Sequence, residues 1–194
     1  MMTKWLFAAI FSLMVTVPTS LVLAISASAA GSKADYDAAV KQADADYKAA
    51  SARCGDMTAN AKDVCQAEAK RDRDVAKATA EASRDGTAKA QAKAHKVKAD
   101  RDYDVAKQMC GDKMGNDKDV CVKEAKVAHE KALGASKVEK AAATGTSTDV
   151  AEARREAKKD TMDAKYKADK EKCDALSGDA KDKCTADVKA RYGK

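Results

Sequence analysis

Small and apolar residues recur at intervals of three and four along two long stretches of the chain. One run follows a 4-3-4-3-4 spacing, and a later run follows a 4-3-4-3 spacing. This periodicity places the small residues on one face of an α-helix and the charged residues on the rest of its surface. The runs are Tyr36, Val40, Ala43, Tyr47, Ala50 and Cys54, and then Cys121, Ala125, Ala128, Ala132 and Ala135.

The same stretches contain a repeat in which a tyrosine is followed by a cysteine seven positions later and by another eleven positions after that. The first two copies, 47–70 and 103–126, are identical at 13 of 24 positions. All six cysteines belong to this pattern, which indicates three copies of one structural unit. The copies are Tyr47-Cys54-Cys65, Tyr103-Cys110-Cys121 and Tyr166-Cys173-Cys184.

Glycine lies between the two cysteines of each copy, where it favours the end of one helix and a turn into the next. In one continuous helix, residues eleven apart are separated by ~16 Å along the axis, whereas a disulfide needs Cα atoms ~4–7 Å apart. A helix that folds back at the glycine brings the cysteines together. We therefore predict the disulfides Cys54–Cys65, Cys110–Cys121 and Cys173–Cys184 in three helical hairpins. The predicted helices pair 33–54 with 60–84, 88–110 with 116–133, and 149–173 with 179–191.

Residues at equal sequence distance from each cystine should face each other, so Tyr103 is predicted to face Ala128. The resulting fold class is all-α, with three disulfide-closed antiparallel hairpins, alanine-rich seams between helices, and an elongated rather than globular shape. The predicted units are hairpin 1 at 31–86, hairpin 2 at 87–140, a linker at 141–148 and hairpin 3 at 149–194.

Composition supports long helices with thin interfaces. After residue 30 there are 38 alanines, only 13 valines and leucines together, and no proline. So few large apolar residues are typical of disordered chains, but alanine has the highest helix propensity and proline is the strongest helix breaker. Two interpretations therefore stay open, a folded helical repeat protein and a hydrophilic chain that is disordered or partly helical in solution.

The first 30 residues resemble a secretory signal peptide. Lys4 is followed by a long apolar run, and small residues end it, so cleavage after Ala29 or Ala30 is expected. The alternative is a leader retained as a membrane anchor, since the uncharged run is long enough to span a bilayer. With cleavage, the mature chain is periplasmic or secreted and has no transmembrane helix. Export places the cysteines where disulfides form.

Catalytic, metal and cofactor motifs are not evident. Ten residues separate the cysteines of each pair, whereas zinc sites usually have two to four, and no phosphate-binding loop or nucleophile motif occurs. We predict no enzyme activity, no metal and no cofactor. Acidic residues nearly balance basic ones, leaving a net charge of about +5 after residue 30. This balance and the lack of aromatic residues near basic clusters argue against nucleic-acid binding.

The densest group of basic residues is a candidate contact with anionic lipid headgroups or envelope sugars. Glu152, Glu156 and Asp160 lie on the same turns and are expected to offset much of its field. The competing interpretation is an ordinary solvated helix face. The four residues are Arg154, Arg155, Lys158 and Lys159.

The segments Asn60–Lys70 and Asn116–Lys126 share the pattern Asn-x-Lys-Asp-Val-Cys-x-x-Glu-Ala-Lys. With the exported leader and the Ala/Lys/Asp-rich helices, this pattern resembles uncharacterised proteobacterial exported proteins that are loosely described as TolA-like cell-envelope proteins. The resemblance implies a periplasmic setting and little about mechanism. Our first interpretation is a non-enzymatic helical protein with a structural or adaptor role in the periplasm or cell envelope, whose partner is an envelope protein or an anionic envelope surface. The alternative function is that of a hydrophilic stress protectant similar to late-embryogenesis proteins.

Overall fold

The computed structural model describes residues 31–194, which form six α-helices and no β-strand. The predicted signal peptide and its cleavage site at Ala29 or Ala30 lie outside these residues. The helices are α1 (Lys33–Cys54), α2 (Ala59–Asp85), α3 (Ala88–Met109), α4 (Gly115–Thr144), α5 (Ser147–Lys172) and α6 (Gly178–Tyr192), with a short 3₁₀ turn (Cys173–Ala175) before α6.

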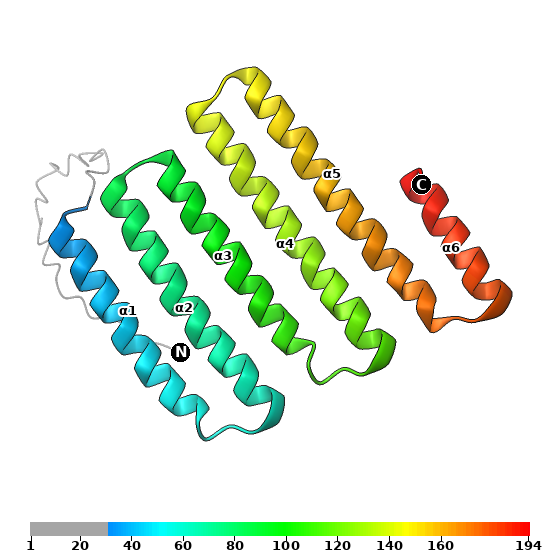
Figure 1. The fold of residues 1–194 in the computed structure, drawn as a ribbon, viewed down its shortest axis with the longest axis horizontal. Coiled ribbons are helices and arrows are strands. Elements are labelled where there is room, and N and C mark those ends of the chain that lie inside the picture. The colour runs from blue at the N-terminus through cyan, green and yellow to red at the C-terminus, as the bar shows by residue number, and fades with distance from the viewer. Residues whose placement is uncertain (1–30) are drawn as a thin grey trace, which may run out of the picture.

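The helices lie side by side in one flat layer, in chain order, with each antiparallel to the next (Figure 1). Extensive packing joins only helices that are consecutive in sequence. The three turns that follow α1, α3 and α5 lie along one edge of the layer, and the turns after α2 and α4 lie along the other. The all-α class and the three hairpins are therefore confirmed, and the layer replaces a globular core within the described residues.

Hydroxyl side chains fix the starts of three helices. Ser32 and Asp35 form a capping box at α1, and Thr146 and Asp149 form another at α5. The Thr87 hydroxyl accepts a hydrogen bond from the third residue of α3. These contacts satisfy amide groups that a helix leaves without partners, so the outgoing helix of each hairpin begins at a defined residue.

Alanine supplies most of the buried surface between helices. Between α2 and α3, four alanines form a continuous apolar cluster with Val97 packed against it. Side chains this small let two helices approach closely but bury little apolar area per residue. The predicted alanine-rich seams are present, and this one also joins the first hairpin to the second. Its alanines are Ala78, Ala82, Ala90 and Ala94.

The register of the hairpins differs from the prediction by one residue. Tyr103 stacks on His129, with ring centroids 4.8 Å apart, and not on Ala128, which is exposed. In the first hairpin, the Arg73 guanidinium lies 4.3 Å from the centre of the Tyr47 ring, the equivalent shifted position. The cause is side-chain direction, because a helical side chain leans toward the start of its own helix. The tyrosine therefore reaches away from the cystine and meets a residue one position further along the returning helix.

The predicted linker 141–148 is mostly helical, because α4 continues to Thr144 and α5 begins at Ser147. The turn between the two hairpins, at Gly145 and Thr146, lies inside this segment, and the helix predicted to end at 133 continues through Gly134. That glycine is buried inside α4 against α5, where an added Cβ atom would lie 2.6 Å from the Ala157 Cβ. Gly134 therefore allows two helices to pack closely and does not mark a helix end.

Candidate functional site

The basic cluster lies in the first half of α5, and all four of its side chains are exposed. Helix α6 runs beside only the second half of α5 (Figure 1), so the segment that carries the cluster has a helical neighbour on one side only. The sequence forms this segment as a helix because the capping box at Thr146 starts it and alanines alternate with charged residues along it. Its members are Arg154, Arg155, Lys158 and Lys159.

The helix divides the cluster into two pairs. Arg154 and Lys158, one helical turn apart, line an open groove between α4 and α5. Arg155 and Lys159 do not line this groove, and the Lys159 ammonium lies 3.0 Å from the Asp163 carboxylate. The structure therefore brings Arg154 and Lys158 to one surface and separates them from the neighbouring pair.

The groove has a volume of about 680 Å³. Small and mostly apolar residues from both helices, which we call its floor, line the groove together with charged residues. We call it the α4–α5 groove. The floor comprises Gly134, Ala135, Val138, Ala157, Thr161 and Met162, and the charged residues are Lys131, Arg154, Lys158, Lys165 and Glu139.

Acidic residues offset this positive charge less than the sequence suggested. The Glu156 and Asp160 carboxylates both lie near the Lys137 ammonium, at 3.5 and 3.3 Å, and neither residue lines the groove. Glu139 does line it, but its carboxylate contacts the His95 imidazole at 2.8 Å. Among residues 31–194, no ion pair involves any of the four cations at the groove. The cations that line this surface are therefore not neutralised by direct ion pairs within these residues.

A separate ion-pair cluster lies around Asp163. Hydrogen bonds from Lys194, at 2.9 Å, and from Lys159, at 3.0 Å, lower the pKa of Asp163 to about 2. Lys159 is therefore held by an acid, whereas the four cations that line the groove form no ion pair within residues 31–194. Two of these four, Lys131 and Lys165, were not part of the basic group that the sequence pattern indicated. Lys165 could have been found, because it lies eleven residues after Arg154 and so shares its helix face, but Lys131 comes from another helix.

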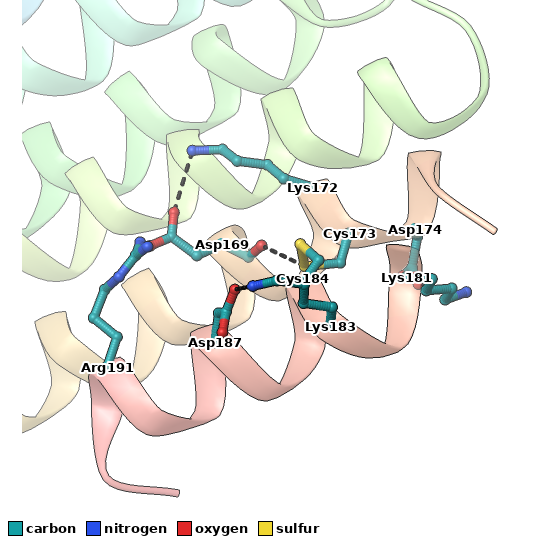
Figure 2. The surroundings of a disulfide bond; sticks show 9 residues. All are labelled: Asp169, Lys172, Cys173, Asp174, Lys181, Lys183, Cys184, Asp187 and Arg191. Atoms are coloured by element: carbon teal, nitrogen blue, oxygen red, sulfur yellow. Dashed lines mark hydrogen bonds and ion pairs between the residues drawn. A yellow bond between two sulfur atoms is a disulfide. The ribbon is translucent and has the colours of Figure 1, made fainter. Parts of the chain in front are cut away.

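The predicted disulfides are confirmed in all three hairpins, with Cα–Cα distances of 5.6, 5.8 and 5.7 Å. Figure 2 shows the third cystine, Cys173–Cys184, with Asp169 and its partners Lys172 and Arg191 close by. The first cysteine of each pair is almost fully buried. Burial and the matching geometry indicate a structural role for the cystines, and such disulfides are typical of proteins outside the cytoplasm.

A second polar cluster, which the sequence analysis did not identify, connects α3 to α4. His129 Nε2 donates a hydrogen bond to the Asp100 carboxylate at 2.7 Å, while Nδ1 lies 3.1 Å from the Lys126 ammonium. Burial tends to raise the pKa of Asp100, but hydrogen bonds from Lys96 and His129 outweigh it and lower the pKa. The cluster stabilises the packing of two helices and does not open onto the groove.

No protein-family model, curated protein or solved structure matches this chain. Across residues 31–194, no helix combines the length and the hydrophobicity needed to cross a bilayer. In the same part of the chain, no group of three or more histidine, cysteine, aspartate or glutamate residues is arranged to hold a metal ion.

Proposed function

We propose that this chain is a non-enzymatic exported helical repeat protein with a structural or adaptor role in the periplasm or cell envelope. The observation that supports this most directly is the single layer of helices. A layer one helix thick exposes two broad faces for its mass, which suits a protein whose role is to contact other surfaces.

The cystines support the same proposal. Each closes a turn at one edge of the layer, and the inter-helix contacts are mostly between alanines. Interfaces of this kind bury little apolar area, so each disulfide, at ~3 kcal/mol in the loop-entropy model, contributes a large share of the stability. A chain with this dependence needs an oxidising compartment, as the periplasm is.

The alternative, a stress protectant that becomes ordered only on drying, makes a different prediction about the protein in solution. Circular dichroism in buffer, with and without reductant, separates the two. The proposed structural or adaptor role predicts high helicity in the oxidised protein and a cooperative thermal transition that moves to lower temperature on reduction. Low helicity in both states would contradict the proposal.

The adaptor role needs a second test in cells that export the protein. A photo-crosslinking amino acid is placed at Ala135 or at Lys140, which line different grooves on α4. An adaptor should give a discrete adduct from one of the two positions, and the adduct should disappear when all six cysteines are replaced by serine. If neither position gives an adduct, and the reduced chain protects an enzyme from drying as well as the oxidised chain does, the stress-protectant function replaces the proposal.

A further inference from the structure

The α4–α5 groove combines an apolar floor with four cations that have no ion-pair partner among the described residues. Lysine and arginine side chains on the other helices commonly meet an acid, as Lys93 meets Glu81 at 2.7 Å. At the groove, only one acid is present, and it contacts His95. A ligand for this surface should therefore carry negative charge and a non-polar part.

A second groove on the layer provides a comparison within the same molecule. It has a volume of about 600 Å³ and is lined by five lysines from α3 and α4. Three of them, Lys93, Lys96 and Lys137, form ion pairs with acids, and Glu81 and Asp85 also line this groove. The two grooves are similar in size, but only the α4–α5 groove keeps most of its positive charge available to a ligand.

The length of the groove limits what can occupy it. Its lining runs from Lys131 to Glu139 on α4, which spans ~12 Å, and from Arg154 to Lys165 on α5, which spans ~16 Å. A stable protein interface usually covers ~800 Å² on each partner, far more than a channel two to three turns long provides. One alkyl chain of medium length fits this dimension, lying along Gly134, Ala135 and Ala157.

We propose that the α4–α5 groove binds a single-chain anionic amphiphile, with the alkyl chain on the apolar floor and the anionic headgroup held by the surrounding lysine and arginine side chains. The small side chains of Ala135 and Ala157 leave room for the alkyl chain. Arg154 and Lys158 lie one turn apart on α5 and provide adjacent donors for a phosphate, sulfate or carboxylate. This inference does not depend on the proposed structural or adaptor role, because it can be tested with the purified protein alone.

The test measures binding of alkyl phosphates, below their micelle concentrations, to the oxidised chain by isothermal titration calorimetry. Inorganic phosphate is the control without a tail. An open groove covers about half of the surface of the alkyl chain. The affinity should therefore rise about twofold for each added methylene, since full burial of a methylene would raise it about fourfold. The rise should stop once the tail exceeds the ~16 Å over which α5 lines the groove. Saturable one-to-one binding with this plateau supports the proposal.

Matched variants locate the site. Arg154→Gln with Lys158→Gln should weaken dodecyl phosphate binding about fivefold for each cation removed at low salt. Arg155→Gln with Lys159→Gln makes the same change in charge one position along the helix and should leave affinity within twofold. Ala135→Leu should block the groove, while Ala128→Leu, also exposed on α4 but outside the groove, should not. Circular dichroism confirms that each variant retains its helicity.

Several results would overturn the proposal. Equal losses in the two charge variants would mean that binding follows net charge and not the groove. Inorganic phosphate that binds as tightly as dodecyl phosphate would indicate a site for simple anions. Binding to phosphatidylglycerol vesicles without binding to monomeric alkyl phosphate would assign the basic residues to a membrane surface. Affinity that continues to rise with tail length would show that the ligand associates with itself.

Discussion

The third hairpin differs from the first two although its cystine has the same spacing and nearly the same Cα–Cα distance. The returning helices α2 and α4 have 27 and 30 residues and pack on neighbours at both sides, whereas α6 has 15 residues and packs on α5 alone. The repeated sequence pattern therefore determines where the chain turns. The length of the returning helix determines how much of its surface packs against neighbouring helices.

Polar contacts near the C-terminus replace the missing alanine interface. The Tyr192 hydroxyl donates a hydrogen bond to Asp169 at 2.8 Å, and Arg191 reaches the same carboxylate at 3.3 Å. The Tyr192 ring also meets the edge of Tyr166, with centroids 5.8 Å apart. An isolated helix of about 15 residues is only marginally stable in water, so α6 depends on these contacts and on its cystine.

Removing the third cystine should therefore produce the largest local effect. We expect Cys173→Ser with Cys184→Ser to abolish hydrogen-exchange protection in α6, because ~3 kcal/mol of loop-closure entropy is lost from a helix with one neighbour. Cys110→Ser with Cys121→Ser should instead lower the melting temperature of the whole layer and leave α6 protected until global unfolding. Equal loss of protection across 166–191 in the two double variants would contradict the difference between the hairpins.

The junction between the second and third hairpins is tested by Gly134→Ala. The added Cβ would lie 2.6 Å from the Ala157 Cβ, and overpacking of this kind costs about 1–3 kcal/mol, against a helix-propensity gain of about 1. The net expectation is a loss of about 0–2 kcal/mol in the free energy of unfolding by urea. Adding Ala157→Gly should recover part of this loss by removing the clash. A double variant less stable than Gly134→Ala would exclude the contact as the cause.

The sequence contains most of the information on the hairpins but little on how side chains from different helices meet. Cysteine spacing and intervening glycine were sufficient to predict all three disulfides, since few other geometries satisfy a bond between residues eleven apart. The one-residue register error at Tyr103 arose because counting from the cystine ignores the direction in which helical side chains lean. Gly134 was misread because a glycine at a close helix contact and one at a helix end look alike in sequence.

The candidate site shows the same limit. Arg154, Arg155, Lys158 and Lys159 are one group in sequence, but a rotation of ~100° per residue separates them into two pairs. The position of Lys131 across the groove depends on the register of α4 against α5. The close contact between Gly134 and Ala157 is one part of that register.

The turn before each returning helix offers a comparison with a smaller effect. Ala59, Gly115 and Gly178 are equivalent residues of the repeat, and all three have positive φ angles, of 49°, 53° and 54°. Alanine is strained in this conformation by about 1 kcal/mol and glycine is not. Ala59→Gly should therefore stabilise the protein by about 1 kcal/mol, and Gly115→Ala should destabilise it by a similar amount. In Gly115→Ala only the backbone strain contributes, because no atom lies within 4 Å of the added Cβ. Urea unfolding of both variants checks this, and a change of the same sign in both would contradict it.

The smallest expected effect is the response of α6 to acid. The pKa of Asp163 is lowered from 3.8 to about 2 by hydrogen bonds from Lys194 and Lys159. Since the folded-state pKa lies below the unfolded value, these contacts stabilise the fold fully above about pH 4 and lose their contribution as the pH falls toward 2. The pKa of Asp169 is also lowered, because hydrogen bonds from Tyr192 and Lys172 outweigh the opposing effect of burial. We expect the amides at the end of α6 to exchange faster, relative to those of α2, as the pH is lowered through this window, after correction for intrinsic rates. Asp163→Asn should flatten this dependence while leaving the cystine intact. The same acid response in α2 and α6, or an unchanged response in the variant, would show that the C-terminal ion pairs do not hold the helix.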